Sequence, residues 1–83
     1  MTAIEVDTSG PTAPPRRNGE LVFDAPWEGR AFGLCLAVLE REGLGWDDFR
    51  PHLVAAIADA PDHTYYEQLA VALDAFLTAR GLT

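Results

Sequence analysis

The residue best suited to chemistry is Arg50, which lies close to Trp46 and Phe49 in the middle of the chain. A guanidinium is always charged, and its five donors form a rigid fork that fits oxyanions. The neighbouring carboxylates allow a simpler role, a surface ion pair with Asp47 or Asp48, because such pairs are common and weak. The residues themselves favour the ion pair, and the oxyanion-binding role needs further support.

The remaining reactive side chains form no recognisable constellation. His52 and His63 lie in separate segments, without the ligand spacing of a metal site. Cys35 is the only cysteine, which fits a reducing compartment. Its simplest role is that of a small buried hydrophobic side chain. Tyr65 and Tyr66 are adjacent, so on a helix they point about 100° apart, and one can join the core while the other faces a site. These features alone indicate a helical interaction module rather than a self-sufficient enzyme.

The net charge of the chain limits the classes of partner that it can bind. Thirteen acids stand against six bases, all of them arginine, for a formal charge of −7. This balance argues against nucleic acid and against an anionic membrane surface, because both require basic patches. The acidic N-terminus lacks the apolar stretch of a signal peptide, and no apolar run approaches the length of a membrane span. We therefore expect a cytoplasmic protein.

The 83 residues suffice for one small domain preceded by an arm. We expect an extended or disordered arm over residues 1–22 and a helical domain over residues 23–83. Three prolines interrupt the arm, at Pro11, Pro14 and Pro15. Two interpretations remain open: a disordered tail, or an arm that lies on a partner with Arg16 and Arg17 as anchors.

The first helix is predicted to begin between Asp24 and Trp27, with Asp24 as a cap, and to end near Glu42 before Gly43. Its apolar residues form two strips at helical spacing. The first strip comprises Trp27, Ala31, Leu34, Cys35 and Val38, and the second Phe32, Leu36 and Leu39. Two strips exceed what one helix of a three-helix unit normally buries, so we expect a partner surface here.

The second helix is predicted to start at Asp47 or Asp48 and to run to about Asp59. Pro51 must then lie in its first turn, where the missing N–H costs little.

The third helix opens with a capping box, in which Thr64 bonds forward and Glu67 bonds back, and it runs to about Arg80. Gly81 is the expected C-cap. The predicted fold class is all-α: a small three-helix unit with an extended, Pro-rich N-terminal arm.

From about Phe23 to Leu82, the order of residues resembles the N-terminal helical domain of the nitrile hydratase β subunit. That family also includes the equivalent subunit of thiocyanate hydrolase and small accessory proteins of nitrile hydratase. The matching residues are Phe23, Trp27, Glu28, Ala31, Phe32, Gly43, Phe49, Arg50, Tyr65, Tyr66 and Gly81.

The resemblance implies a role at a metal site that belongs to another chain. In such enzymes the α subunit holds cobalt(III) or iron(III) in a claw with cysteines oxidised to sulfenic and sulfinic acids. Arg50 matches a β-subunit arginine that binds those oxygens, and a guanidinium fork suits them. Tyr65 matches a tyrosine whose hydroxyl lies near the active site. The implied catalytic residues are therefore Arg50 and Tyr65, with no metal ligand in this chain.

The resemblance also implies a substrate channel, lined or bordered by Trp46, Phe49, Cys35 and Leu69. Leu69 stands where many relatives carry tryptophan, and Cys35 replaces a larger aromatic residue. Both changes widen the pocket and favour a bulkier nitrile. Pro51 replaces a residue that is commonly glycine, so the backbone beside Arg50 is expected to differ.

The implied partners are the metal-binding α subunit, a separate β-barrel subunit that supplies a second claw-binding arginine, and a nitrile substrate. The chain resembles the helical half of a split β subunit, as in toyocamycin nitrile hydratase. Two alternatives remain: an accessory protein that delivers the α subunit or its metal, and a subunit of thiocyanate hydrolase. Accessory relatives usually lack the Phe-Arg pair, so Phe49 and Arg50 favour the subunit.

Overall fold

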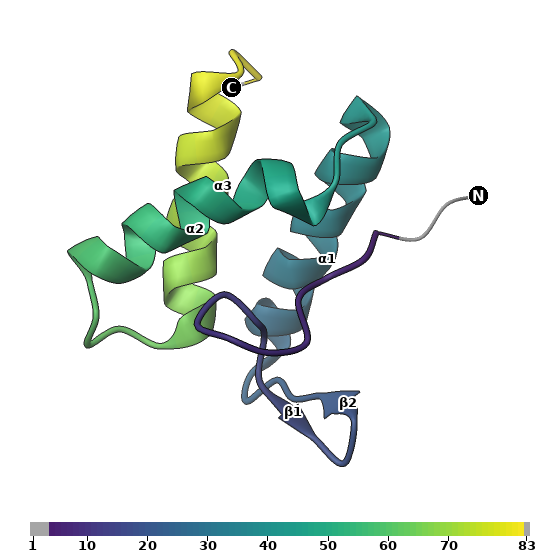
Figure 1. The fold of residues 1–83 in the computed structure, drawn as a ribbon, viewed down its shortest axis with the longest axis vertical. Coiled ribbons are helices and arrows are strands. Elements are labelled where there is room, and N and C mark those ends of the chain that lie inside the picture. Colours follow the sequence, from purple (N-terminus) through teal and green to yellow (C-terminus); the bar gives the residue numbers. More distant parts are fainter. Residues whose placement is uncertain (1–3, 83) are drawn as a thin grey trace.

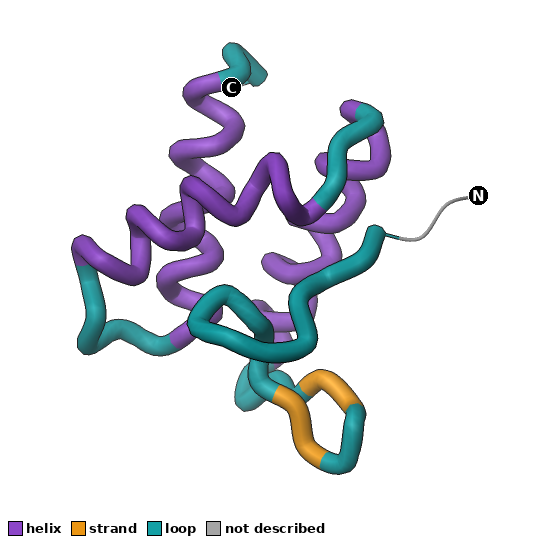
Figure 2. The backbone as a smooth tube through the Cα atoms, in the orientation of Figure 1, coloured by secondary structure: helices purple, strands orange, loops and turns teal. Residues whose placement is uncertain are grey.

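The computed structural model describes residues 4–82, and residues 1–3 of the predicted arm and Thr83 lie outside the described residues. Its elements are β1 (Arg16–Arg17), β2 (Glu20–Leu21), α1 (Pro26–Glu42), α2 (Trp46–Asp59) and α3 (Tyr65–Ala79). Helix α3 packs against both α1 and α2, and α2 crosses α3 (Figure 1). Loop segments make up most of the arm (Figure 2). The predicted all-α, three-helix fold is confirmed.

Helix α1 begins at Pro26 and ends at Glu42, both as predicted, but its first turn is capped differently. The Glu28 carboxylate accepts hydrogen bonds from the backbone N–H groups of Asp24 and Ala25, so Glu28 supplies the polar contact at this end. The prediction that the Asp24 side chain caps the helix is therefore wrong. At the other end Gly43 adopts the left-handed conformation, with φ of 69°, which suits a residue without Cβ.

Helix α2 begins at Trp46, one or two residues earlier than predicted. Its N-cap is Gly45, whose N–H donates to the Asp48 carboxylate over 2.9 Å. Pro51 consequently lies in the second turn rather than the first, and the prediction for it is wrong by one turn. A proline at this position has no N–H to donate to the carbonyl of Asp47, so this turn is held by one backbone hydrogen bond fewer.

Helix α3 has the predicted capping box. The N–H of Glu67 donates to Thr64 Oγ1 over 3.3 Å, and the N–H of Thr64 donates to Glu67 Oε1 over 2.8 Å. The residue at the C-cap is Arg80, and Gly81 follows it with φ of 69°. Local sequence therefore predicted the start of this helix correctly and its end to within one residue.

The core lies where the three helices meet, and aromatic side chains fill its centre. The buried apolar residues are Phe32, Cys35, Leu39, Trp46, Phe49, Leu53, Ala56, Tyr66, Leu69, Ala72, Leu73 and Phe76. On α1 the two predicted strips are divided between core and surface. Trp27 is 39% exposed and Leu34 54% exposed, so α1 carries apolar surface that residues 4–82 leave uncovered.

The arm contains a short antiparallel hairpin that the sequence analysis did not predict. Arg16 pairs with Leu21, and Asn18 and Gly19 form the turn with φ values of 54° and 81°. Positive φ at both central positions is what a tight type I′ hairpin turn requires, and Asn-Gly is its favoured dipeptide. The helices of residues 4–82 all fall short of the length and hydropathy that crossing a bilayer demands.

Candidate functional site

The start of α2 places Arg50 at the surface of the molecule. Phe49, the preceding residue, is fully buried between Trp46 and Phe76, with ring centroids 5.2 Å and 5.8 Å away. Because successive helix residues point about 100° apart, this anchor turns Arg50 outward. The Arg50 side chain remains 37% exposed. The core therefore fixes the direction of the guanidinium without covering it.

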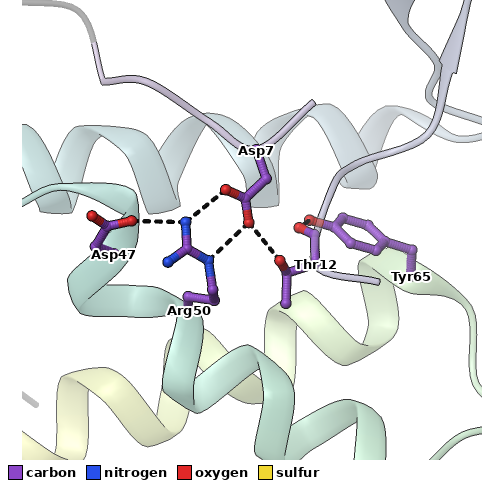
Figure 3. A network of polar contacts seen from close by, with 5 residues as sticks. All are labelled: Asp7, Thr12, Asp47, Arg50 and Tyr65. Atoms are coloured by element: carbon purple, nitrogen blue, oxygen red, sulfur yellow. Dashed lines mark hydrogen bonds and ion pairs between the residues drawn. The ribbon is translucent and has the colours of Figure 1, made fainter. Parts of the chain in front are cut away.

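Two carboxylates hold the guanidinium of Arg50 (Figure 3). Its Nε donates to Asp7 Oδ2 over 2.9 Å, and its Nη2 donates to Asp7 Oδ1 over 2.6 Å. Asp47 Oδ1 lies 2.7 Å from the same Nη2. The ion pair with Asp47 was one of the two interpretations that the sequence left open. Asp7 was missed, because it lies 43 residues away and no local pattern links it to Arg50.

The same carboxylate connects Arg50 to Tyr65. Thr12 Oγ1 donates to Asp7 Oδ2, and the Tyr65 hydroxyl donates to the backbone carbonyl of Thr12 over 2.8 Å (Figure 3). The arm thus passes along the start of α2 and reaches the start of α3. The two residues predicted to be catalytic belong to one polar network, which is built through the arm.

The electrostatics of the network favour charged Asp7 and charged Arg50. The hydrogen bonds from Arg50 lower the pKa of Asp7 from 3.8 to about 2; burial opposes this effect, and Thr12 and Trp46 lower the pKa further. Hydrogen bonding to Asp7 in turn raises the pKa of Arg50, so the guanidinium stays protonated. The Trp46 indole N–H is buried without a hydrogen-bond partner among the described residues. It lies outside hydrogen-bond geometry toward Asp7, yet close enough to favour the charged carboxylate.

Tyr65 and Tyr66 lie in different environments, as their adjacent positions on a helix allow. Tyr66 is buried in the core, whereas Tyr65 is half-buried and faces the arm. Burial raises the pKa of Tyr65 well above its usual value. The phenol is therefore protonated at neutral pH, and it can donate a hydrogen bond but cannot serve as a base.

A hollow of about 590 Å³ opens beside Arg50. It is lined by Glu5, Val6, Asp7, Thr8, Ser9, Asp47 and Arg50. Three carboxylates and one guanidinium give this lining a formal charge of −2. In this conformation the hollow repels anions, although its central residue is a cation.

The four residues predicted to line a substrate channel lie in the core. Cys35, Phe49 and Leu69 are fully buried, and Trp46 is nearly so. None of the four lines the hollow beside Arg50. Within the chain they support the helices, and their role in a channel stays a prediction that concerns an assembly.

The described residues offer no cluster suited to a metal ion. Among residues 4–82, no group of three or more His, Cys, Asp or Glu side chains is placed to hold one. Burial raises the pKa of the Cys35 thiol from 9.0 to about 12, so the thiolate that would bind a metal is disfavoured.

Comparison with known families identifies the family to which the chain belongs. Residues 6–83 match the family model of the nitrile hydratase beta subunit, N-terminal. The chain belongs to this family. The matched residues begin well before Phe23 and include Asp7 and Thr12 of the arm. No curated protein and no solved structure matches the chain.

Proposed function

We propose that this chain is a small β-like subunit of a heteromeric, metal-dependent nitrile hydratase, which converts a nitrile and water to an amide. Membership of the nitrile hydratase β-subunit family supports the class of enzyme. The chain would act only with an α subunit that holds cobalt(III) or iron(III), and with a β-barrel subunit that supplies a second arginine. A metal of this kind would polarise the nitrile when bound in the α subunit.

The observation that carries the proposal is the placement of Arg50. Its helix is anchored by the fully buried Phe49, its charge is secured by Asp7, and its side chain remains partly exposed at the rim of a hollow. With its Nε and Nη2 edge free, a guanidinium in this position can donate two parallel hydrogen bonds to an oxidised cysteine of the α subunit. Arg50 would thereby stabilise the oxidised thiolates and orient the metal site.

Tyr65 would contribute as a hydrogen-bond donor. Its raised pKa keeps the hydroxyl protonated, so it can bind the claw, the substrate or the attacking water without removing a proton. In this structure the hydroxyl donates to Thr12. Tyr65 acts in the proposed assembly only after it exchanges that partner.

The test is reconstitution of the complex with an Arg50→Ala variant. We expect nitrile hydration to fall by a factor of about 100 or more, the size of effect seen when one transition-state or site-organising donor is removed. Circular dichroism should show the same helix content as the unmodified chain. Arg41→Ala is the matched control, because Arg41 is an exposed arginine in the last turn of α1. The complex reconstituted with Arg41→Ala should hydrate the nitrile as fast as the unmodified complex.

Full activity of the Arg50→Ala complex would remove Arg50 from the site. Two further measurements separate the alternatives. A stoichiometric complex that persists during turnover supports a subunit, whereas release after loading of the α subunit or its metal supports an accessory protein. A panel of bulky nitriles, small nitriles and thiocyanate distinguishes nitrile hydration from thiocyanate hydrolysis and tests the preference for bulky substrates.

A further inference from the structure

The Asp7 carboxylate occupies a site that is built for an oxyanion. Two nitrogen atoms of Arg50 and the hydroxyl of Thr12 donate to it, and the Trp46 indole N–H stands close by without a hydrogen-bond partner among residues 4–82. Arg50 and Trp46 both come from the first two turns of α2. Asp7 and Thr12 belong to the arm (Figure 3). We call the two α2 side chains, Arg50 and Trp46, the cradle.

We propose that Asp7 occupies the cradle in the free chain and that an oxyanion of the partner subunit, its oxidised cysteine, occupies the same cradle after assembly. On assembly Asp7 leaves the fork of Arg50, and a sulfinate-type group replaces it. The Trp46 indole N–H becomes an additional donor to that group. The chemical class of the ligand rests on the proposed function, whereas the exchange itself concerns residues of this chain.

Geometry supports exchange over simultaneous binding. A carboxylate and a sulfinate both present two oxygens on one central atom, so both fit the Nε and Nη2 edge of a guanidinium. Asp7 already uses that edge, and Asp47 uses Nη2 as well. An oxyanion that arrived with Asp7 in place would find only the remaining amino group.

The charges that line the hollow also favour exchange over simultaneous binding. With Asp7 seated, the hollow carries three carboxylates against one guanidinium. A further anion would add to this negative charge at short range, which is unfavourable. Departure of Asp7 removes one of the three carboxylates and restores donors to the cradle.

The architecture allows the Asp7 carboxylate to leave while α2 stays in place. Phe49 and Trp46 lie in the core and hold the start of α2, and Ile4 and Val6 of the arm are partly buried against that core. Asp47 is on the same helix as Arg50 and continues to position its guanidinium. Around the Arg50 network the arm's side-chain hydrogen bonds are those of Asp7 and Thr12. The cradle is therefore preformed, and only its occupant changes.

The experiment is a titration of the full chain with methanesulfinate, followed by ¹⁵N NMR at the Arg50 Nε–H and the Trp46 indole N–H. We compare the unmodified chain with Asp7→Ala, which empties the cradle, and with Asp7→Asn, which removes the charge but keeps the shape. Asp7→Ala should bind methanesulfinate about tenfold more tightly or better, with Asp7→Asn between the two. The Trp27 indole, on α1, should not shift.

Glu5→Gln is the matched control. Glu5 is exposed and lines the same hollow, so this variant removes one negative charge without touching the cradle. Its affinity for methanesulfinate should stay within about twofold of that of the unmodified chain. An equal gain in Glu5→Gln and Asp7→Asn would reduce the effect to general charge and overturn the exchange.

Two other results also overturn it: methanesulfinate bound equally well by the unmodified chain and Asp7→Ala, or no shift at Arg50 and Trp46 in any variant. Helix content by circular dichroism, measured in parallel, verifies that each variant is folded. The titration needs no partner subunit, so its failure is distinguishable from a failure of the activity assay with Arg50→Ala.

Discussion

The helical bundle is stabilised mainly by apolar contacts, whereas the N-terminal arm also depends on polar contacts. Within the bundle, contacts between α3 and its two neighbours are apolar, and residues such as Phe49, Leu53 and Leu69 are completely buried. At the start of α2, the arm is attached through hydrogen bonds and an ion pair in which Asp7 and Thr12 are the central residues, in addition to partly buried apolar side chains such as Ile4 and Val6. Apolar burial does not titrate and is not screened by ions, whereas exposed ion pairs depend on pH and are screened by salt.

This difference shows how one small chain can combine a fixed site with a replaceable occupant. Buried apolar surface has no alternative partner in water, so the bundle stays closed. A carboxylate on a partly exposed guanidinium can be replaced by another oxyanion of similar shape at little cost. Three predictions test whether the bundle and the arm are as independent as their contacts indicate.

The largest effect is expected for truncation of the core. Phe49→Ala removes a fully buried ring that contacts Trp46 and Phe76, and should lower the free energy of unfolding by about 3–5 kcal/mol. In a chain of this size that loss unfolds a large fraction of the molecules. Urea denaturation followed by circular dichroism measures it.

Val54→Ala on the same helix is the control, since Val54 is half exposed and its truncation should change the stability by less than about 0.5 kcal/mol. If Phe49→Ala proved as mild as Val54→Ala, the core would not be the element that fixes Arg50.

Acid should release the arm while the bundle persists. The pKa of Asp7 is 3.8 when unperturbed and about 2 beside Arg50, so charged Asp7 favours the docked arm. This stabilisation is fully present above pH 3.8 and is lost as the pH falls through about 2. NMR signals of Thr12 and the Tyr65 ring should therefore change in this window, with most of the helical circular dichroism retained.

The Asp7→Asn variant separates this step from acid effects on the helix caps. It has no carboxylate to titrate at this position, so the Thr12 and Tyr65 signals should show no such transition. A transition of equal size in Asp7→Asn would mean that some other acid group controls the arm.

The smallest effects distinguish the two adjacent tyrosines. Tyr65→Phe removes the hydrogen bond to the Thr12 carbonyl and should cost about 0.5–1.5 kcal/mol. The Tyr66 hydroxyl is buried without a hydrogen-bond partner among the described residues, so Tyr66→Phe should be neutral or slightly stabilising. Thermal unfolding of the two variants compares them directly, and a larger loss for Tyr66→Phe would contradict the assignment.

Local signals in the sequence were enough for most of the helical architecture. The Thr64 and Glu67 capping box and the glycine after α1 and α3 are satisfied within a few residues, so composition and spacing predict them. The Asn18-Gly19 turn was equally local and was overlooked, although that dipeptide is a strong hairpin signal. The position of Pro51 was missed because the cap moved from Asp47 or Asp48 to Gly45, a residue with no side-chain signal.

The sequence by itself determined the three helices, the ion pair with Asp47 as one of two interpretations for Arg50, and the resemblance to the nitrile hydratase β subunit. Only the tertiary structure decided that Asp7 fills the fork of Arg50 and that Thr12 links it to Tyr65. Helical periodicity and caps are written in residues three or four apart, so they can be recognised along the chain. A contact across 43 residues depends on where the folded arm comes to lie, and no spacing in the sequence records that.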